Sequence, residues 1–326
     1  MSTAADRSHA ILAVLADGQF HSGEVLAHSL GVTRAAVWKK VRALEALGLE
    51  VFRIPGKGYR LADPLQLLDA EAIRAALAPM TRDRLAGLTL LDVVDSTNTW
   101  LAGHPGEPAL CLAEFQSAGR GRRGRGWVSP FGANLYLSLA WRFDEWPPGF
   151  TALGMVSAIA AARALEALGV EGVRIKWPND LVARDRKLGG VLVDIQGEPP
   201  GATRTVIGVG LNVRMPAMAA GRIDQPWMDL ATLTGGKTPD RNALAAALVE
   251  SLFAALDRFS VAGFAAFQPD WQRLDLVSGR AVALQAHDRT VTGVADGVDE
   301  HGALLLRTPH GIERFVSGDV SLRVTS

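Results

Sequence analysis

Apolar residues repeat at helical spacing in three short segments at the start of the chain. Ser22 and Thr33 precede the second and third segments and are good N-caps, and Gly18, Gly31 and Gly48 mark where the three segments end. The third segment has the most regular stripe, with apolar residues separated by four, three and three positions: Val37, Val41, Leu44 and Leu47. A Pro-Gly-Lys-Gly turn at 55–58, between apolar residues 51–54 and 59–61, indicates a β-hairpin. Residues 6–61 therefore predict three helices and a hairpin.

Beyond residue 63, short apolar runs alternate with two long helical patterns. The runs predict strands at 88–94, 110–115, 134–141, 173–177, 191–195 and 206–213. Helices are predicted at 69–77, from Ser96 onward, at 151–168 and at 240–259. Because several strands separate the two long helices, we expect an α+β domain whose sheet is covered on one side.

The pattern changes after Trp271, where short apolar runs alternate with turns. Strands are predicted at 282–284, 290–295, 303–307, 313–317 and 322–324, a spacing typical of a small β-barrel of the SH3-like kind. The expected organisation is multidomain α+β. A winged helix-turn-helix occupies 1–63, an α+β domain 64–272 and the barrel 273–326.

Charge separates the N-terminal segment from the rest of a chain whose formal net charge is zero. Residues 1–60 hold eight Lys and Arg against five Asp and Glu, which favours a DNA-facing module on a mildly acidic body. The single cysteine, Cys111, excludes an intrachain disulfide and a cysteine metal cluster, so no metal site is expected. With neither a signal pattern nor an uncharged membrane-length run, we expect a cytoplasmic protein without membrane contact.

The third helix and the hairpin carry a set of polar and basic positions that suits DNA. The exposed face of the helix and the hairpin tip predict these DNA-binding residues: Thr33, Arg34, Ala35, Trp38, Lys39, Arg42 and Lys57. Arg53 and Arg60 on the hairpin are expected near phosphates. The alternative is a helical protein-interaction module. Trp38 is an unusual base-contacting residue, and its alternative role is packing between domains.

Four arginines alternate with glycines between two predicted strands, in the segment from Gln116 to Trp127. Glycine lets backbone amides approach an anion, and arginine adds bidentate contacts to phosphate or carboxylate. Such a segment would close over a bound anion and exclude water. The alternative is a flexible arginine-glycine stretch that binds RNA. The segment differs from a phosphate-binding P-loop because no Gly-Lys-Ser/Thr follows it.

Two further basic segments lie at predicted strand ends, Lys176–Asp180 and Arg186–Gly190. Alone, each is an ordinary turn next to a hairpin. Together with the arginine-rich segment, they predict a cationic pocket for a substrate with two negative groups, such as a carboxylate and a nucleotide phosphate.

These segments, taken in order, resemble the biotin–protein ligase family in its bacterial form with a fused winged-helix repressor domain. The resemblance covers nearly the whole chain, and the matching pieces are Asp95-Ser-Thr-Asn98, Gln116 to Trp127, Ser129-Pro-Phe-Gly-Ala-Asn-Leu135, Lys176-Trp-Pro-Asn-Asp-Leu181, Lys187-Leu-Gly-Gly190 and Gly208-Val-Gly-Leu-Asn-Val213.

The resemblance implies a role for each matching residue. It implies biotin-binding positions at Ser96, Thr97, Asn98, Gln116, Arg120, Gly121, Arg122 and Lys187, with Lys187 and Arg122 as the catalytic pair. It implies nucleotide-binding positions at Arg125, Lys176, Asn179, Asp180, Asn212, Trp227 and Arg323. Two of these have plain alternatives, because Ser96 suits a helix N-cap and Trp227 suits a core position.

The implied activity is ATP-dependent ligation in two steps. Biotin and ATP, with Mg²⁺, form biotinyl-5′-AMP, and the biotinyl group then passes to a lysine of a biotin carboxyl carrier protein. Biotinyl-5′-AMP would also act as corepressor by favouring a homodimer that binds operator DNA. One alternative is a lipoate or octanoate ligase of the same fold, whose octanoyl-transferring type needs a nucleophilic cysteine. Another is a transcription factor that senses a ligand without catalysis.

Overall fold

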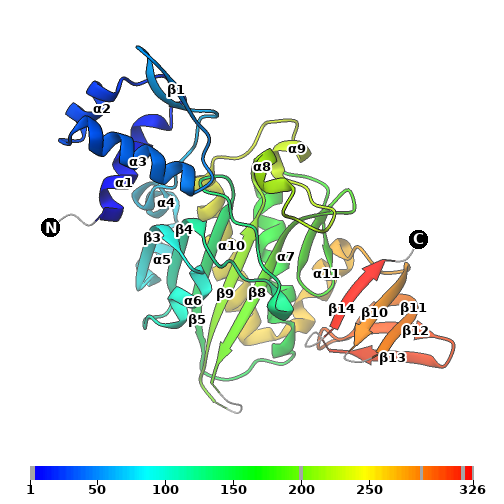
Figure 1. Ribbon diagram of the computed structural model, residues 1–326. Coiled ribbons are helices and arrows are strands. Elements are labelled where there is room, and N and C mark those ends of the chain that lie inside the picture. Colours follow the sequence, from blue (N-terminus) through cyan, green and yellow to red (C-terminus); the bar gives the residue numbers. More distant parts are fainter. Residues whose placement is uncertain (1–3, 198–200, 287–288, 317–319, 325–326) are drawn as a thin grey trace.

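The computed structural model describes residues 4–197, 201–286, 289–316 and 320–324 and arranges them in three units along the chain (Figure 1). The N-terminal unit contains α1 (Ala4–Leu15), α2 (Gly23–Ser29), α3 (Arg34–Ala46), β1 (Val51–Ile54) and β2 (Gly58–Leu61). The Ser22 hydroxyl accepts a hydrogen bond from the Val25 amide at 3.1 Å, and Thr33 accepts one from the Ala36 amide at 3.2 Å. Each cap stabilises its helix by about 1 kcal/mol. The predicted winged helix-turn-helix is confirmed.

The N-terminal unit rests on the central one through apolar contacts. Its core joins α1, α2 and α3, and it includes Phe131, which belongs to the central unit. The linker adds Leu65, whose amide donates to the Ala16 carbonyl at 2.9 Å. Gly132 has φ +65°, which favours glycine, and a Cβ there would lie 3.3 Å from the Leu65 side chain, which would have to shift slightly.

The central unit is built on a seven-stranded sheet in the order β3-β4-β5-β9-β8-β7-β6. Only β3 and β4 are parallel in the described registers, and the other neighbours are antiparallel. The strands are β3 (Gly87–Val94), β4 (Ala109–Gln116), β5 (Leu135–Phe143), β6 (Val173–Lys176), β7 (Asp180–Ala183), β8 (Arg186–Gln196) and β9 (Thr203–Leu211). Strand β7 has only four residues, and it pairs within a region expected to be turns.

One face of this sheet is covered by two long helices, α7 (Leu153–Ala167) and α10 (Arg241–Ala262). Leu110, Leu137 and Val209 point to this face and join the main core. Among the described residues, one helical segment, Phe150–Ala167, is long and apolar enough to cross a membrane by length and composition, but 72% of it is buried inside the structure. That burial is typical of a core helix.

The opposite face of the sheet is only partly covered. Helix α6 (Thr97–Ala102) packs there, and its Leu101 forms a small cluster with Cys111, Ala140 and Val206. Side chains alternate between the two faces along each strand, so Tyr136 and Ser138 of β5 point to the same face as α6. We call this the open face of the sheet because neither of the two long helices covers it.

Shorter helices border the sheet: α4 (Ala70–Ala76), α5 (Pro79–Arg84), α8 (Ala217–Ala220), α9 (Leu230–Leu233) and α11 (Gln268–Leu274). The C-terminal unit is an antiparallel sheet in the order β13-β12-β11-β10-β14. Its strands are β10 (Ala281–Ala286), β11 (Arg289–Val298), β12 (Leu304–Thr308), β13 (Gly311–Phe315) and β14 (Val320–Val324). The expected three-part α+β class is confirmed.

Candidate active site and nucleic-acid interface

Two glycines in the middle of a cross-strand row form a trough across the open face of the central sheet. Tyr136, Gly210, Gly190 and Asp180 are successive cross-strand neighbours on β5, β9, β8 and β7. A Cβ at Gly210 would lie 2.7 Å from the Trp127 ring. A Cβ at Gly208, one row away, would overlap the Asn98 side chain. Glycine therefore lets other segments lie directly on the sheet.

A cavity of about 1220 Å³ lies over this trough. It is closed on one side by the 117–126 loop, and twelve of the residues with implied biotin or nucleotide roles line it: Ser96, Thr97, Asn98, Gln116, Arg120, Gly121, Arg122, Arg125, Lys176, Asn179, Asp180 and Lys187. Segments more than 90 residues apart in the sequence are thus brought to one place.

Hydrogen bonds organise the end of the cavity near α6. The Gln116 side-chain oxygen accepts from the Thr97 amide at 2.9 Å and from its hydroxyl at 3.1 Å. The Gln116 amide group donates to Ser129 Oγ at 3.1 Å. Ser138 Oγ lies 2.6 Å from Asn98 Oδ1, and Asn98 Nδ2 donates to Asp194 at 3.0 Å. This buried, fixed set of donors and acceptors suits a neutral polar group of a ligand.

The 117–126 loop is a short turn between two anchored ends. The Gly121 amide donates to the Arg125 carbonyl at 2.7 Å, and the Trp127 amide donates to the Gly119 carbonyl at 2.8 Å. Arg123 at the tip has φ 57°, a left-handed conformation that costs a non-glycine residue about 1 kcal/mol or more. Arg122 donates to Asn179 Oδ1 at 3.1 Å, which holds the tip near β7.

Lys187 lies on the floor of the cavity with a carboxylate and an aromatic ring beside it. Its ammonium donates to Asp180 Oδ1 at 2.7 Å and lies 5.6 Å from the centre of the Trp127 ring. Lys187 and Asp180 remain partly exposed, at 18% and 20% of their side-chain surface. A partly exposed pair of this kind is weakly held, so the ammonium is available to an incoming anion.

Two expected nucleotide-binding residues, Asn212 and Trp227, are not among the described residues that line the cavity. Asn212 is buried, and its side-chain amide donates to the Met228 carbonyl at 3.1 Å. Trp227 is half-buried on a segment that pairs in parallel with Lys187 through backbone hydrogen bonds. The backbone of Arg323 is paired with Ala283 on β14 and β10, while its side chain lies outside the described residues.

Sequence reasoning assigned no role to several residues of the site. Ser129, Ser138, Asp194 and Trp127 contact the expected residues directly, and Arg280 and Asp185 form an ion pair at 2.9 Å on the cavity rim. Ser129 and Trp127 belong to segments that the resemblance matched as wholes. Asp194 lies mid-strand, and only its partners in space mark it.

Cys111 lies apart from the cavity. It is fully buried under α6, and burial raises the pKa of its thiol to about 12. A thiol that remains protonated and inaccessible is a poor nucleophile.

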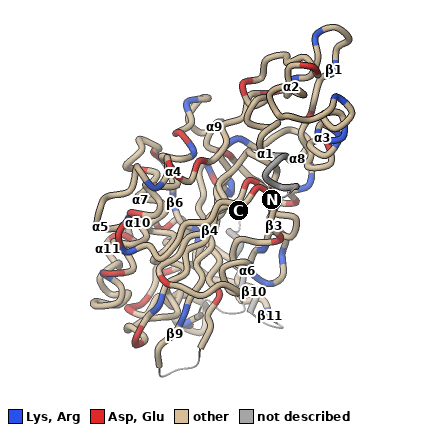
Figure 2. Tube along the Cα trace, turned by 90° about the vertical axis from the view of Figure 1, so that its left-hand side faces the viewer, with Lys and Arg blue, Asp and Glu red and all other residues tan. Residues whose placement is uncertain are grey.

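The N-terminal unit presents its third helix to solvent. Arg34, Ala35, Trp38, Lys39 and Arg42 are exposed on the side opposite the buried stripe. Trp38 is 47% exposed, with the Arg42 guanidinium 5.4 Å from its ring centre, so the described structure does not bury it between domains. Figure 2 shows basic positions along α3 and near β1.

The basic residues of the hairpin differ in their surroundings. Lys57 is exposed at the turn. Arg53 forms an ion pair with Glu45, and Arg60 stacks 4.8 Å from the Phe52 ring centre and 5.3 Å from that of Phe20. Arg60 thus contributes packing to the hairpin as well as charge.

Family models match each of the three units. Residues 90–212 match the biotin/lipoate A/B protein ligase family, residues 277–323 match the biotin protein ligase C terminal domain, and residues 7–60 match an HTH domain. Together with the cavity, these matches define a class of protein, a ligase core of the biotin and lipoate type with a helix-turn-helix attached.

Full-length relatives make the assignment more specific. The chain is 44% identical to the bifunctional ligase/repressor BirA of Salmonella typhimurium and 43% identical to that of Escherichia coli, each over 96% of both chains. The chain therefore belongs to the biotin–protein ligase family, in its bifunctional ligase/repressor form. A solved biotin protein ligase from Aquifex aeolicus, in complex with biotin and ATP, covers 74% of this chain and all of its own, with a TM-score of 0.64 and 28% identity.

Proposed function

We propose that this protein is an ATP-dependent biotin–protein ligase that forms biotinyl-5′-AMP, transfers biotin to an acceptor lysine, and acts as a biotin-responsive transcriptional repressor. The observation that carries the ligase is the arginine-rich loop over a cavity with Lys187 on its floor. The relatives named as ligase/repressors match 96% of the chain, including all three units, which supports both activities in one protein.

The first step joins two anions, so the site must supply positive charge. A biotin carboxylate oxygen attacks the α-phosphorus of ATP, and the bond to the bridging oxygen breaks to release diphosphate. We assign to Lys187 and Arg122 the neutralisation of the carboxylate and of the charge that develops at phosphorus. Arg125 and Lys176 line the same cavity and are assigned to the nucleotide phosphates. Positioning and electrostatics suffice, and no enzyme nucleophile takes part.

The second step is aminolysis of the mixed anhydride. A neutral lysine amine of the acceptor attacks the biotinyl carbonyl, the carbon–oxygen bond to AMP breaks, and the amine loses a proton. Until the acceptor arrives, the 117–126 loop would shield the anhydride from water. The acceptor we propose is a biotin carboxyl carrier protein, which the resemblance to the ligase/repressor relatives implies and whose lysine would have to reach this cavity.

The magnesium ion implied by the family is expected to arrive with the nucleotide. Among the described residues, no group of three His, Cys, Asp or Glu is placed to hold a metal ion. Magnesium commonly keeps several waters and binds substrate phosphates with one or two carboxylates. A partly exposed carboxylate such as Asp180 fits that limited role. When bound, the ion would add positive charge at the phosphates.

Repression requires that ligand binding in the central unit affects DNA binding by the N-terminal unit. We propose that biotinyl-5′-AMP favours a homodimer through an edge of the central sheet, where β3 and β6 are the outer strands. The dimer would place two α3 helices on two operator half-sites. Functional domain boundaries near 63/64 and 272/273 are consistent with the three family matches.

The ligase is tested by mass spectrometry of a biotin-acceptor domain incubated with the protein, ATP, Mg²⁺ and biotin, with lipoate and octanoate in parallel. We expect a biotin-sized gain on one lysine, and a reduction of about a hundredfold or more in rate for Lys187→Ala. A gain with lipoate alone would assign the protein to the lipoate branch, and no gain with any acid would support a ligand-sensing regulator.

The repressor is tested by selecting bound sequences from a random duplex pool and footprinting the selected site. We expect protection to require biotin and ATP together. Lys57→Ala should weaken binding and lower the slope of log affinity against log salt by about one unit. Equal affinity with and without biotin plus ATP would rule out corepression.

A further inference from the structure

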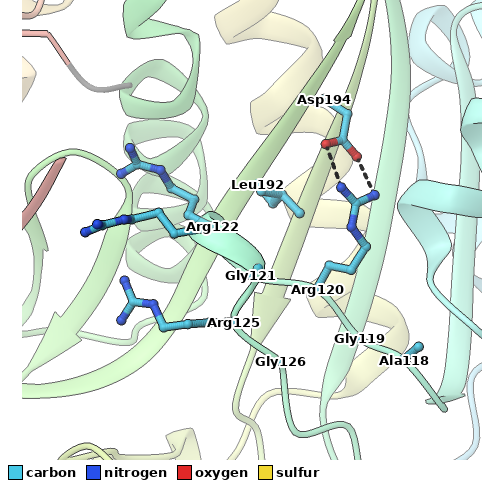
Figure 3. A pocket seen from close by; sticks show the side chains of 11 residues that line it. Ala118, Gly119, Arg120, Gly121, Arg122, Arg125, Gly126, Leu192 and Asp194 are labelled. Atoms are coloured by element: carbon cyan, nitrogen blue, oxygen red, sulfur yellow. Dashed lines mark hydrogen bonds and ion pairs between the residues drawn. The ribbon is translucent and has the colours of Figure 1, made fainter. Parts of the chain in front are cut away.

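The arginines of the 117–126 loop point in two directions. Figure 3 shows Arg120 pointing toward Asp194 on β8, whereas Arg122 and Arg125 point to the opposite side of the loop. Arg120 donates to the two Asp194 oxygens at 3.2 and 3.3 Å, a paired geometry that fixes both side chains. The loop therefore has a root tied to the sheet and a tip that carries the other arginines.

Asp194 also contacts helix α6, which contributes other residues to the cavity lining. Its Oδ2, which accepts from Arg120, accepts from Asn98 Nδ2 at 3.0 Å as well. Asn98 belongs to α6 and to the end of the cavity assigned to biotin. One carboxylate thus joins the loop, the sheet and α6, although the three segments are far apart in the sequence.

The sheet register explains why Asp194 can reach both partners. Asp194 is paired with Val206, and it points to the same face as Leu192 and Gly190. Because Gly208 has no side chain, Asn98 can lie on the sheet beside this row. The Asp194 side chain is one-quarter exposed, so its ion pair with Arg120 forms at the surface of the cavity and is not buried in the protein interior.

A direct role for Asp194 in binding the reacting groups conflicts with its charge. Biotin's carboxylate and the ATP phosphates are anions, and a carboxylate would repel them. Both Asp194 oxygens already accept hydrogen bonds.

We propose that Asp194 is a positioning residue, which holds the root of the 117–126 loop over the biotin-binding end of the cavity by binding Arg120 and Asn98 at once. The inference rests on the proposed ligase and names the residue that sets the closed position of its loop. Because the root is held, the tip arginines remain directed at the nucleotide side.

The first test is trypsin cleavage of the full chain without substrates, followed as the peptides that end at loop arginines 122, 123 and 125. We expect Asp194→Asn and Asp194→Ala to be cut there at least about fivefold faster than the wild type, because the freed root lets the loop enter the protease. Asp194→Glu, which keeps the charge, should restore much of the protection. Asp296→Asn, which removes an exposed arginine partner on the C-terminal sheet, is the matched control and should be unchanged.

The second test separates positioning from a general loss of structure. For Asp194→Asn, the biotin KM should rise about tenfold while kcat falls less than about threefold. The reason is that a loosened loop weakens the binding of biotin more than it slows the reaction of biotin once it is bound. Arg120→Met should give a similar change, and the double variant should be no worse than either single variant.

The outcomes separate this inference from the proposed ligase. Additive losses in the double variant, or unchanged loop cleavage in Asp194→Asn, would overturn the positioning role. If the wild type transfers no biotin at all, the ligase proposal fails, whereas the cleavage comparison still decides whether Asp194 holds the loop.

Discussion

The two faces of the central sheet use ion pairs in different ways. On the covered face, Arg241 at the start of α10 pairs with Glu114 of β4 at 2.8 Å, and their side chains are 4% and 0% exposed. On the open face, the Lys187–Asp180 and Arg120–Asp194 pairs both keep contact with solvent. The charges of the first pair are inaccessible to a substrate, and those of the other two are accessible.

Complete hydrogen bonding accompanies the burial of the first pair. Arg241 also donates to the Gln66 carbonyl at 2.6 Å and to the Asn134 carbonyl at 2.7 Å, and the second Glu114 oxygen accepts from the Leu68 amide at 2.5 Å. A buried charge is tolerated only with such partners. The pair therefore fixes the linker that follows the winged helix, whereas the open face keeps charges that can exchange partners with a ligand.

Removing the buried carboxylate should have the largest effect. Glu114→Ala leaves the Arg241 guanidinium buried and unpaired, and we expect a loss of about 3–5 kcal/mol of stability. Melting followed by near-UV circular dichroism should show a clearly lower Tm. Asp257→Asn, which breaks the exposed pair with Arg84, is the control and should lose about 1 kcal/mol or less. A Glu114→Ala protein as stable as the control would contradict the difference between the faces.

Filling the trough on the open face should have the second-largest effect, and it should weaken the binding of biotin. In Gly210→Ala, the new Cβ would lie 2.7 Å from the Trp127 ring, so the ring and the loop behind it must move. Overpacking of this kind costs about 1–3 kcal/mol of stability. Because the displaced ring and loop border the cavity, biotin KM should rise by about tenfold, which corresponds to about 1.4 kcal/mol of binding free energy.

Gly87→Ala on β3 is the matched control for the trough, since a Cβ there meets no atom within 4 Å. Titration of biotin in steady-state ligation compares the two variants. Equal KM values for Gly210→Ala and Gly87→Ala would show that the glycine trough does not contribute to the binding of biotin.

Local signals predicted the winged helix and the long elements well. Ser22 and Thr33 cap helices where the sequence placed caps, and the stripe that contains Val37 and Val41 is buried. Strand β7 was missed because its four residues follow a Trp-Pro-Asn segment that favours a turn. Short elements depend on neighbouring strands that a local pattern does not show.

The residues of the site can also be separated into those that a local sequence signal predicts and those that depend on distant neighbours. Lys187 and the arginine-rich loop stand out because basic residues and glycines cluster in the sequence. Glu114 and Arg241 are 127 positions apart, and Arg120 and Asp194 are 74 apart, so neither pair leaves a local signal. A single carboxylate on a strand is ordinary until its partners are known.

Removing the thiol of Cys111 should have the smallest effect, although Cys111 lies on the open side of the sheet. Its pKa is raised to about 12 by burial, so below pH 9 the thiol stays protonated in the folded protein, and the stability linked to it decreases as the pH rises above 9.0. We expect Cys111→Ala to keep kcat/KM for biotin transfer within about twofold of the wild type, with about 1 kcal/mol of stability lost to the small cavity. Iodoacetamide at pH 8 should label the native protein far more slowly than the unfolded chain. A loss of more than tenfold in the rate of transfer would instead indicate that Cys111 takes part in the reaction, as in an octanoyl transferase. Reacting groups on the open face would then come from β4 as well as from the 117–126 loop.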